Sequence, residues 1–351
     1  MTRIEKEAGA IRLPTISVVV CTRDRPKDLV ELLHALLDQT YPPFEVIVVD
    51  ASLSNRVQKL VDSFQSKFHK DGLRYIKARD DGLPAARNLG VRLSNGDAIL
   101  FLDDDTLLEN NLLDALAIFL HEHPNAIGIQ PQVHGLFARP TNGIKRKIKN
   151  TMYKAFMLNY YKQNTLSVRK SGLSGFPYSY PLTEEANAQR LDGCCMCYRR
   201  EIFEKLSFDT NLKRWAFMED LDFSYRAYKK NLGTLHAIPS AIITHKKSTK
   251  SRLPSRERTY MTTIYWFYVF FKDVLEGSIL NLLAFLWALA GNLVTMVVGL
   301  LVERRSKPAW WNLVYLSHSY AVAFANLKAV INGDLGFFNK SLNGQGKVED
   351  K

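Results

Sequence analysis

Three consecutive aspartates, Asp103, Asp104 and Asp105, directly follow an apolar run at residues 98–102. No basic residue separates them, so their charges would repel one another and destabilise the end of a strand. A divalent cation removes this repulsion, because hard cations prefer oxygen ligands. The same ion can bridge a diphosphate and neutralise charge as the phosphate leaves. The triplet therefore predicts a metal site for a phosphorylated ligand; the structural alternative is a cluster of helix-capping residues ahead of residue 111.

A second acidic group, Glu219 and Asp220, stands at the start of a helix predicted over residues 220–230. A carboxylate in this position is often only a helix cap. A hydroxyl group that attacks a carbon centre requires a general base, however. An acidic group that is remote in sequence from the metal ligands can supply that base, so the two acidic groups together predict an active site.

Apolar runs and helical patterns alternate between residues 15 and 135, and they have to position these side chains. This alternation predicts an α/β protein with a doubly wound, mainly parallel sheet. Ligands bind such sheets at the carboxyl ends of the strands, where Thr22, Asp50 and Asp103 all fall. The predicted strands cover residues 16–21, 44–49, 73–78 and 98–102, and the predicted helices cover 26–38, 55–68, 84–93 and 111–121.

Residues 134–189 are less regular, with a basic run, many tyrosines and several Gly and Pro residues. We interpret this stretch as a variable insertion that lies over the acceptor side of the site. Regular structure is predicted to resume at residue 190 with a strand, a short helix and the helix at 220–230.

Six segments carry a recognisable pattern between about residues 15 and 250. They are ISVVVCTRDRP at 16–26, FEVIVVDAS at 44–52, GLPAARNLG at 82–90, FLDDD at 101–105, EDLDFSYR at 219–226 and ITH at 243–245. Together they resemble a family 2 glycosyltransferase of the GT-A fold, similar to bacterial cell-surface polysaccharide glycosyltransferases, and their order and spacing agree with that family. The resemblance implies inverting transfer of a sugar from a nucleotide-diphosphate donor to a hydroxyl group.

The resemblance also implies a set of donor-binding residues. Thr22, Arg23 and Arg25 lie where the loop after the first strand touches the nucleotide. Asp50 should bind the base or the ribose. Contacts with the donor are further implied for Arg87 and Asn88.

Metal-binding and catalytic roles follow in the same way. Asp103 and Asp105 form the DxD pair that holds Mn²⁺ or Mg²⁺ and the donor, with Asp104 between them on the donor side. His245 is a further metal ligand by resemblance, whereas taken alone it could equally be a solvated histidine in a basic loop. Asp220 is the general base, and Glu219 positions the acceptor.

Two departures from the family pattern limit what can be predicted. The residues after Asp50 are Ala51 and Ser52, where relatives often have a second polar residue and a glycine, which leaves the nucleotide open. A QxxRW motif is absent, since the corresponding region reads KKSTK at 246–250. Its absence favours the addition of one or a few sugars without excluding polymerisation.

The composition favours anionic partners, such as nucleic acid, phosphorylated small molecules or an anionic membrane surface. The formal net charge is +12, hydrophobic residues make up 46% of the chain, and three of the four cysteines crowd at 194–197. This cysteine pattern suits a reducing compartment rather than a disulfide framework. Residues 1–14 lack the apolar core of a cleavable signal peptide, so we expect the catalytic part to stay in the cytoplasm.

The C-terminal part is strongly apolar. Residues 279–302 carry no charge, and as a helix of about 36 Å they could cross a bilayer. Residues 309–327 form a second uncharged stretch, and the basic residues at 245–258 would attract anionic lipid. A single span would place the basic residues at 304–307 on the far side, against the positive-inside tendency. A span, a re-entrant or in-plane pair and a buried helix pair all stay open.

These observations predict an organisation and a location. We expect an N-terminal extension at 1–14, a catalytic domain at 15–258 with its insertion at 134–189, a membrane-associated helical region at 259–331 and a polar tail at 332–351. The enzyme should work at the cytoplasmic face of the inner membrane. Its acceptor would be a polyprenyl-linked or cell-surface glycan, and membrane lipids would be partners.

Other classes of function fit less well. An inactive nucleotide-sugar-binding or scaffold protein of a membrane glycan-assembly complex would need a damaged metal or base position, but Asp103, Asp105 and Asp220 are all present. Nucleic-acid binding is not expected, because no helix-turn-helix, zinc-finger or RNP-like motif accompanies the positive charge. A nucleotidyltransferase would need a Gly- and Lys-rich phosphate loop near the N-terminus, which is missing.

Overall fold

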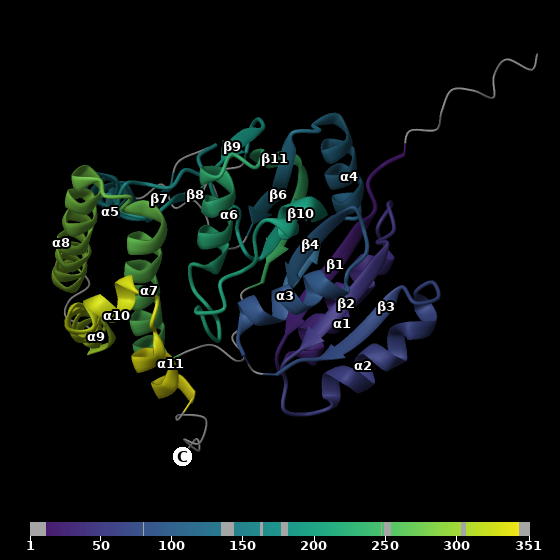
Figure 1. Ribbon diagram of the computed structural model, residues 1–351, viewed down its shortest axis with the longest axis horizontal. Helices are drawn as coiled ribbons and strands as arrows, with labels where there is room; N and C mark the ends of the chain where they lie inside the picture. The colour runs from purple at the N-terminus through teal and green to yellow at the C-terminus, as the bar shows by residue number, and fades with distance from the viewer. Residues whose placement is uncertain are drawn as a thin grey trace, which may run out of the picture.

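The computed structural model describes residues 12–343 except 80, 135–143, 162–163, 177–181, 247, 249–253 and 303–306. Its central feature is a nine-stranded mixed sheet of order β3–β2–β1–β4–β10–β6–β11–β5, with β9 paired to β11 (Figure 1). The strands are β1 (Ile16–Thr22), β2 (Glu45–Asp50), β3 (Leu73–Lys77), β4 (Ala98–Asp103), β5 (Thr106–Leu108), β6 (Ala126–His134), β9 (Ala186–Ala188), β10 (Cys195–Arg199) and β11 (Thr234–His245).

Strands β3, β2, β1 and β4 are parallel, as the sequence predicts, and their carboxyl ends meet at one edge. The register places Thr22 opposite Asp50 and Cys21 opposite Asp103. Strand β10 is antiparallel to both β4 and β6, so it begins at the edge where β4 ends. The doubly wound, mainly parallel sheet is thus confirmed, with antiparallel strands added beyond β4.

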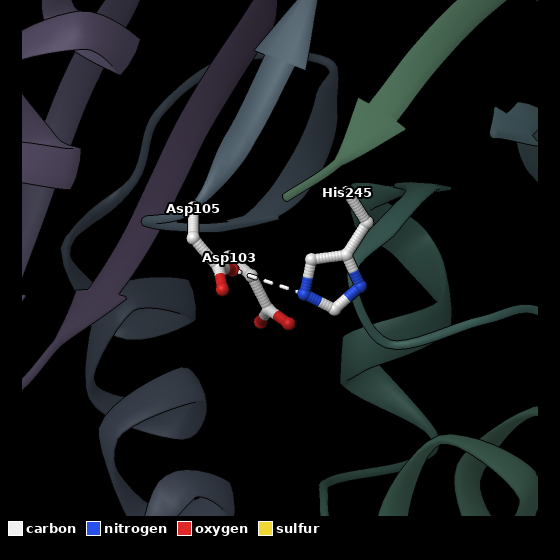
Figure 2. Close-up of side chains that lie close together, drawn as sticks. All are labelled: Asp103, Asp105 and His245. Atoms are coloured by element: carbon white, nitrogen blue, oxygen red, sulfur yellow. Dashed lines mark ion pairs between the residues drawn. The ribbon is translucent and has the colours of Figure 1, made fainter. Parts of the chain in front are cut away.

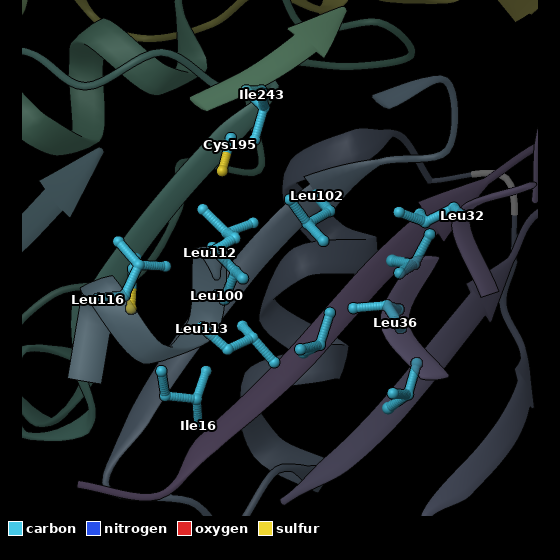
Figure 3. Packing of buried hydrophobic residues seen from close by; sticks show 14 of the residues in the cluster. Ile16, Leu32, Leu36, Leu100, Leu102, Leu112, Leu113, Leu116, Cys195 and Ile243 are labelled. Carbon is cyan, nitrogen blue, oxygen red and sulfur yellow. The ribbon is translucent and has the colours of Figure 1, made fainter. Parts of the chain in front are cut away.

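The strands read as continuous apolar runs because helices cover both faces of the sheet. In β1, Val18 and Val20 face α1 (Pro26–Leu37), α2 (Arg56–Phe64) and α4 (Leu112–Glu122). Val19 faces the other side, in the cluster that includes α3 (Leu83–Leu93) and α6 (Glu219–Lys229). Figure 3 shows the first of these clusters, in which side chains of α1 and α4 pack against the sheet.

The insertion contains a helix that the sequence analysis did not predict. Helix α5 (Ile144–Ala155) includes the basic run, and the short pair β7 (Tyr160–Tyr161) and β8 (Gly175–Phe176) follows it. No Gly or Pro interrupts residues 144–155, and their many Lys, Arg, Met and Ala residues favour helix formation. The basic run, the tyrosines and the Gly and Pro residues elsewhere in 134–189 are typical of irregular structure and conceal this helix.

The C-terminal helices are α7 (Ser255–Val269), α8 (Ile279–Val302), α9 (Lys307–Ala325), α10 (Leu327–Ile331) and α11 (Gly336–Asn343). A one-turn π-helix, η3 (Phe270–Val274), continues α7. Among the described residues, one helix is long and apolar enough to cross a membrane, over Ile279–Leu301, with a mean hydropathy of 2.0.

A second hydrophobic cluster crosses the domain boundary expected at residue 258. Fully buried Phe267 of α7 shares this cluster with Leu212 and Leu221 of the catalytic part. The Tyr265 hydroxyl accepts a hydrogen bond from the Lys213 N–H at 2.9 Å. Helix α7 is therefore a core helix that joins the two parts of the chain.

The expected polar tail also contains an ordered contact. Phe338 of α11 is 5% exposed and belongs to the same cluster. The Asn339 side chain accepts a hydrogen bond of 2.9 Å from the Tyr265 hydroxyl and donates one of 2.9 Å to the Asn211 carbonyl. The beginning of the tail thus docks on α7 and on the loop beneath it.

Replacement of Phe285 tests whether the C-terminal helices are part of one core. Phe285 is 1% exposed, and its ring stacks on Phe270 with a centroid distance of 4.0 Å. Phe285→Ala should lower the free energy of unfolding by about 3–5 kcal/mol in detergent, measured by guanidinium unfolding. Leu286→Ala, at a neighbouring side chain that is 44% exposed, is the control and should cost less than about 1 kcal/mol. Equal losses would contradict this packing.

Candidate active site

A cavity of about 600 Å³ opens at the carboxyl ends of β1 and β4. Ten of the twelve residues singled out in the sequence line it; the other two are Asp50 and Asn88. The ten are Thr22, Arg23, Arg25, Arg87, Asp103, Asp104, Asp105, Glu219, Asp220 and His245. Side chains from strand ends, helix starts and one loop therefore meet in a single cavity.

Asp103, Asp105 and His245 form the candidate metal site (Figure 2). One potential ligand atom from each lies within 4.8 Å of the others. Asp105 follows the end of β4, and the next residue, Thr106, pairs with His245 between the antiparallel strands β5 and β11. The β5–β11 pairing thus brings residues 140 positions apart into one site.

The donor set fits a divalent cation. Asp105 Oδ1 lies 3.0 Å from His245 Nε2, yet Asp105 Oδ1 and His245 Nδ1 are buried without a hydrogen bond of acceptable geometry. Buried polar atoms in proteins almost always have partners, and an ion is one such partner. Two carboxylates and an imidazole are a ligand set that a divalent metal ion can accept.

Charges around the trio keep Asp105 ionised. Burial alone would raise the pKa of Asp105, but the close contact with His245 and the charge of that residue lower it to about 2. Burial would lower the pKa of His245, and the contact with Asp105 instead raises it. Asp105 is therefore available as an anionic ligand throughout the physiological range.

Asp104 connects the metal site to the loop after β1. It accepts hydrogen bonds from Thr22 Oγ1 at 2.6 Å and from Arg25 Nη1 at 3.0 Å. Burial raises the pKa of Asp104 to about 7 against the opposing effect of Arg25. Its side chain is 5% exposed, so in this structure Asp104 braces the loop more than it presents itself to a ligand.

Arg87 is the buried centre of the opposite wall. Its Nη1 donates to Glu219 Oε1 at 2.6 Å, its Nη2 donates to the Gly193 carbonyl at 2.7 Å, and Asp103 lies 3.7 Å away. Arg87 is 2% exposed, so this ion pair is shielded from water. The pair connects α3 to the first turn of α6 and thereby fixes where Asp220 projects.

Asp220 faces the same cavity from the start of α6. It accepts hydrogen bonds from the Arg190 guanidinium and, at 3.1 Å, from the Gly193 N–H. A Cβ on Gly193 would lie 3.0 Å from Glu219 Oε1 and 3.2 Å from Arg87 Nη2, so a side chain there would crowd the ion pair. The glycine lets α6 and β10 approach closely enough to hold both carboxylates.

Two predicted donor contacts lie outside the cavity lining. Asn88 donates to the Phe208 carbonyl and accepts from the Phe208 N–H, both at 2.9 Å, which makes it a brace between α3 and the loop that precedes α6. Asp50 is fully buried and accepts hydrogen bonds of 2.8 Å from the Ser52 N–H and the Tyr75 hydroxyl. In this structure both side chains support the site from behind.

The sequence analysis missed Arg190 and Asp192, which also line the cavity. Arg190 contacts Asp192 at 3.3 Å and donates to the Ser174 hydroxyl at 3.0 Å. The sequence does contain a pattern that could have identified them, because both charged residues stand just before an apolar strand. Residues in that position reach the ligand-binding edge if the strand is antiparallel to β4. Its direction could not be read from the sequence.

The loop before α6 is a second missed feature. Arg214, Ala216 and Met218 have φ values of 54°, 44° and 81°, in the left-handed region that side chains with a Cβ rarely adopt. Trp215 and Phe217 alternate with them and line the cavity. Unfavourable backbone conformations of this kind gather at functional sites.

The sequence profile described as "Glycosyl transferase family 2" matches residues 17–207 of the 351-residue chain. The chain belongs to glycosyl transferase family 2. The match includes β1 to β4 with the Asp103–Asp105 triplet, and it ends before α6 and the second acidic group.

Two named relatives resemble only part of the chain in sequence. Poly(ribitol-phosphate) beta-N-acetylglucosaminyltransferase TarS of Staphylococcus aureus is 29% identical over 109 residues, which are 30% of this chain and 19% of TarS. Glucosyl-dolichyl phosphate glucuronosyltransferase of Haloferax volcanii is 27% identical over 116 residues, or 32% of this chain and 36% of that enzyme. The chain thus matches well under half of either relative.

The structural likeness is broader. Mannosyltransferase PcManGT from Pyrobaculum calidifontis, solved in complex with GDP-Man and Mn²⁺, superposes with a TM-score of 0.52 at 17% identity. The superposition covers 89% of this chain and 87% of that one. It confirms the GT-A fold that the sequence predicts.

Removal of the Asp105 carboxylate should abolish metal binding. We expect Asp105→Asn to weaken Mn²⁺ binding by more than about a hundredfold, beyond the usual effect of residues that only support a ligand. Isothermal titration calorimetry with Mn²⁺ measures this. Asp97→Asn, just before the other end of β4, should bind Mn²⁺ like the unmodified chain. Unchanged binding by Asp105→Asn would show that the trio does not hold the ion.

The Arg87–Glu219 pair gives a separate stability prediction. Arg87→Met leaves the Glu219 carboxylate buried without its guanidinium, so thermal unfolding should show a loss of about 3–5 kcal/mol. The double variant Arg87→Met/Glu219→Gln removes the stranded charge and should recover much of that loss. A double variant less stable than the single one would contradict the pairing.

Proposed function

We propose that the protein transfers a sugar from a nucleotide-diphosphate donor to a hydroxyl group of a lipid-linked or cell-surface glycan, with inversion at the anomeric carbon. One observation carries the proposal: a trio of potential metal ligands and the carboxylate of Asp220 line the same cavity. Hydroxyl attack on a sugar diphosphate needs both a group that binds the pyrophosphate and a group that accepts a proton.

Asp103, Asp105 and His245 would hold Mn²⁺ or Mg²⁺. When bound, such an ion supplies a Lewis acid that neutralises charge on the leaving diphosphate. The solved relative from Pyrobaculum calidifontis contains GDP-Man and Mn²⁺ on the same fold, which supports this assignment.

The loop after β1 and the start of α3 would bind the rest of the donor. Thr22, Arg23 and Arg25 line the cavity beside the aspartates, and Arg25 is already held by Asp104 at 3.0 Å. Arginine side chains bind phosphate oxygens through several N–H groups at once. Arg87 of α3 also lines the cavity, whereas Asp50 is fully buried outside the lining and would support the strand ends from behind.

Asp220 would be the general base. The acceptor oxygen forms a bond to the anomeric carbon, its proton passes to the Asp220 carboxylate, and the bond to the diphosphate oxygen breaks with its electron pair leaving on the nucleoside diphosphate. A single displacement of this kind inverts the anomeric centre. Asp220 Oδ2 accepts hydrogen bonds from Arg190 and from the Gly193 N–H. Asp220 Oδ1 accepts one from the Leu221 N–H at 2.7 Å.

A membrane-linked acceptor agrees with the apolar C-terminal helix, and we propose that the enzyme works at the cytoplasmic face of the cell membrane. The glucuronosyltransferase of Haloferax volcanii is named for a glucosyl-dolichyl phosphate acceptor, a sugar on a lipid phosphate. An acceptor of that chemistry would approach the cavity from the bilayer surface.

A screen of UDP- and GDP-sugars with Mn²⁺, scored by release of the nucleoside diphosphate, tests the activity. With the donor that it identifies, Asp220→Asn should retain donor binding and lower kcat by about 10²–10⁴-fold, because a general base contributes that much. Glu201→Gln, at an exposed carboxylate of the 3-10 turn after β10, is the control and should keep full activity. Normal turnover by Asp220→Asn would refute the base assignment, and no release from any donor would refute the activity.

A further inference from the structure

Helix α8 exposes an apolar face along its whole length. The exposed side chains are three, four or seven residues apart, and the terminal ones, Ile279 and Leu301, are 72% and 68% exposed. Between them lie Leu283, Trp287, Val294 and Val297, which are 43–58% exposed. We call these six residues the outer stripe. The opposite face of α8, with Phe285 and Ala288, is buried against the second hydrophobic cluster.

Helix α9, which packs beside α8, also exposes apolar side chains. Trp310 and Trp311 near its beginning are 56% and 53% exposed, and Phe324 near its end is 47% exposed. Figure 1 shows α8 and α9 at the end of the molecule opposite β3 and α2, where α8 runs across that end and forms the outer edge. An apolar surface of this extent is unfavourable in water and marks a docking face.

Helix α5 is fixed to the middle of α8. The Trp287 indole N–H donates to the Ala155 carbonyl at 2.9 Å, and the Phe156 ring lies 5.1 Å from the Trp287 ring. Phe156 also packs on Gly291, where a Cβ would come within 2.2 Å of it. Residues 287–291 lie at the centre of the 24-residue helix.

This attachment conflicts with a membrane-spanning α8. In a span, the centre of α8 would lie in the middle of a hydrocarbon layer about 30 Å thick. The end of α5 would lie there too, with exposed Lys154 next to the anchoring Ala155. Charged side chains in the bilayer centre are strongly unfavourable. The same contacts are compatible with a helix that lies along the membrane surface.

The charge of α5 suits such a surface. Lys147 and Lys149 are exposed on a helix that packs beside α8. Exposed lysines beside an apolar face, with tryptophans at its edge, are the composition of helices that lie at a membrane interface.

We propose that the outer faces of α8 and α9, with α5 at their rim, form a monotopic surface for an anionic bilayer, with α8 parallel to the membrane plane. The outer stripe enters the interface between headgroups and acyl chains, and Lys147 and Lys149 contact anionic headgroups. This inference rests on the membrane location in the proposed function and specifies how the chain meets the membrane. It also sets the end of the molecule that bears α2 farthest from the lipid.

Depth measurements along α8 separate this arrangement from a span. Nitroxide labels on cysteines placed singly at Leu283, Ala290 and Val297 share one helical face, because they are seven residues apart. The full chain carries Cys21→Ala and is reconstituted in phosphatidylcholine vesicles containing phosphatidylglycerol; the other native cysteines are buried. Collision with oxygen and with a water-soluble nickel complex reports the depth of each label. A label at Leu53, which is 91% exposed, gives the aqueous reference.

We expect the same shallow depth at all three positions of α8. In a spanning helix the three depths would differ, because seven residues rise about 10 Å along the helix. The label at residue 290 would then lie deepest of the three, or about 10 Å deeper than one of the other two. Either pattern overturns the in-plane surface. Labels that never contact lipid, together with a dimer in gel filtration, would mean that a second copy of the chain covers this face.

Charge reversal on α5 tests the headgroup contact. Lys147→Glu/Lys149→Glu should weaken binding to the anionic vesicles by about 25-fold or more, because each basic residue near such a surface contributes roughly fivefold. Lys59→Glu/Lys70→Glu makes the same change on exposed lysines in and after α2 and should bind nearly as the unmodified chain does. Equal losses in the two variants would show a general charge effect and overturn the role of α5.

Binding of Mn²⁺ and sugar nucleotide, measured on the unlabelled chain with its native Cys21 in the same vesicles, keeps the two proposals apart. A chain that binds the donor but shows unequal depths refutes the in-plane surface alone. A chain with equal depths that binds no sugar nucleotide refutes the proposed transferase alone.

Discussion

Three adjacent carboxylates at the end of a buried strand must be compensated by positive charge. Basic side chains around the cavity supply that charge. Arg25 reaches Asp104 from the start of α1, Arg87 approaches Asp103 from α3, and His245 contacts Asp105 from the end of β11. The residual unpartnered atoms on Asp105 and His245 point to a further cation. Electrostatic repulsion within the triplet thus determines both the neighbours that surround it and the ligand it can bind.

The Arg87 ion pairs also connect the metal-ligand trio to the start of α6, where Asp220 lies. Arg87 joins α3 to Glu219, so the start of α6 is fixed relative to the metal-ligand trio. The loop before α6 rests on α7, where Tyr265 binds the Lys213 backbone. Because α7 also packs against α8, the C-terminal helices support the helix that carries Asp220. A surface bound to lipid would therefore be connected to the site by a continuous core.

Much of the fold follows from local pattern. Strands β1, β2 and β4 are buried on both faces. Each is therefore a continuous apolar run, which predicts a strand from sequence alone. The basic composition of helix α5 conceals its helical character, and the apolar residues of α7, which is buried against the catalytic part, resemble those of a lipid-facing segment. Burial in a protein core and burial in lipid call for the same residue types, so sequence cannot separate them.

By itself, the sequence determined the alternation of strands and helices and the acidic groups at residues 103–105 and 219–220, because these depend on neighbouring residues and on strand ends. Only the tertiary structure decided that His245 meets Asp105, that Arg190 holds Asp220, and that Asn88 supports the site from outside the cavity. These contacts join residues 30 to 140 positions apart, and they depend on the direction and register of strands that hydrogen bonds between distant segments set.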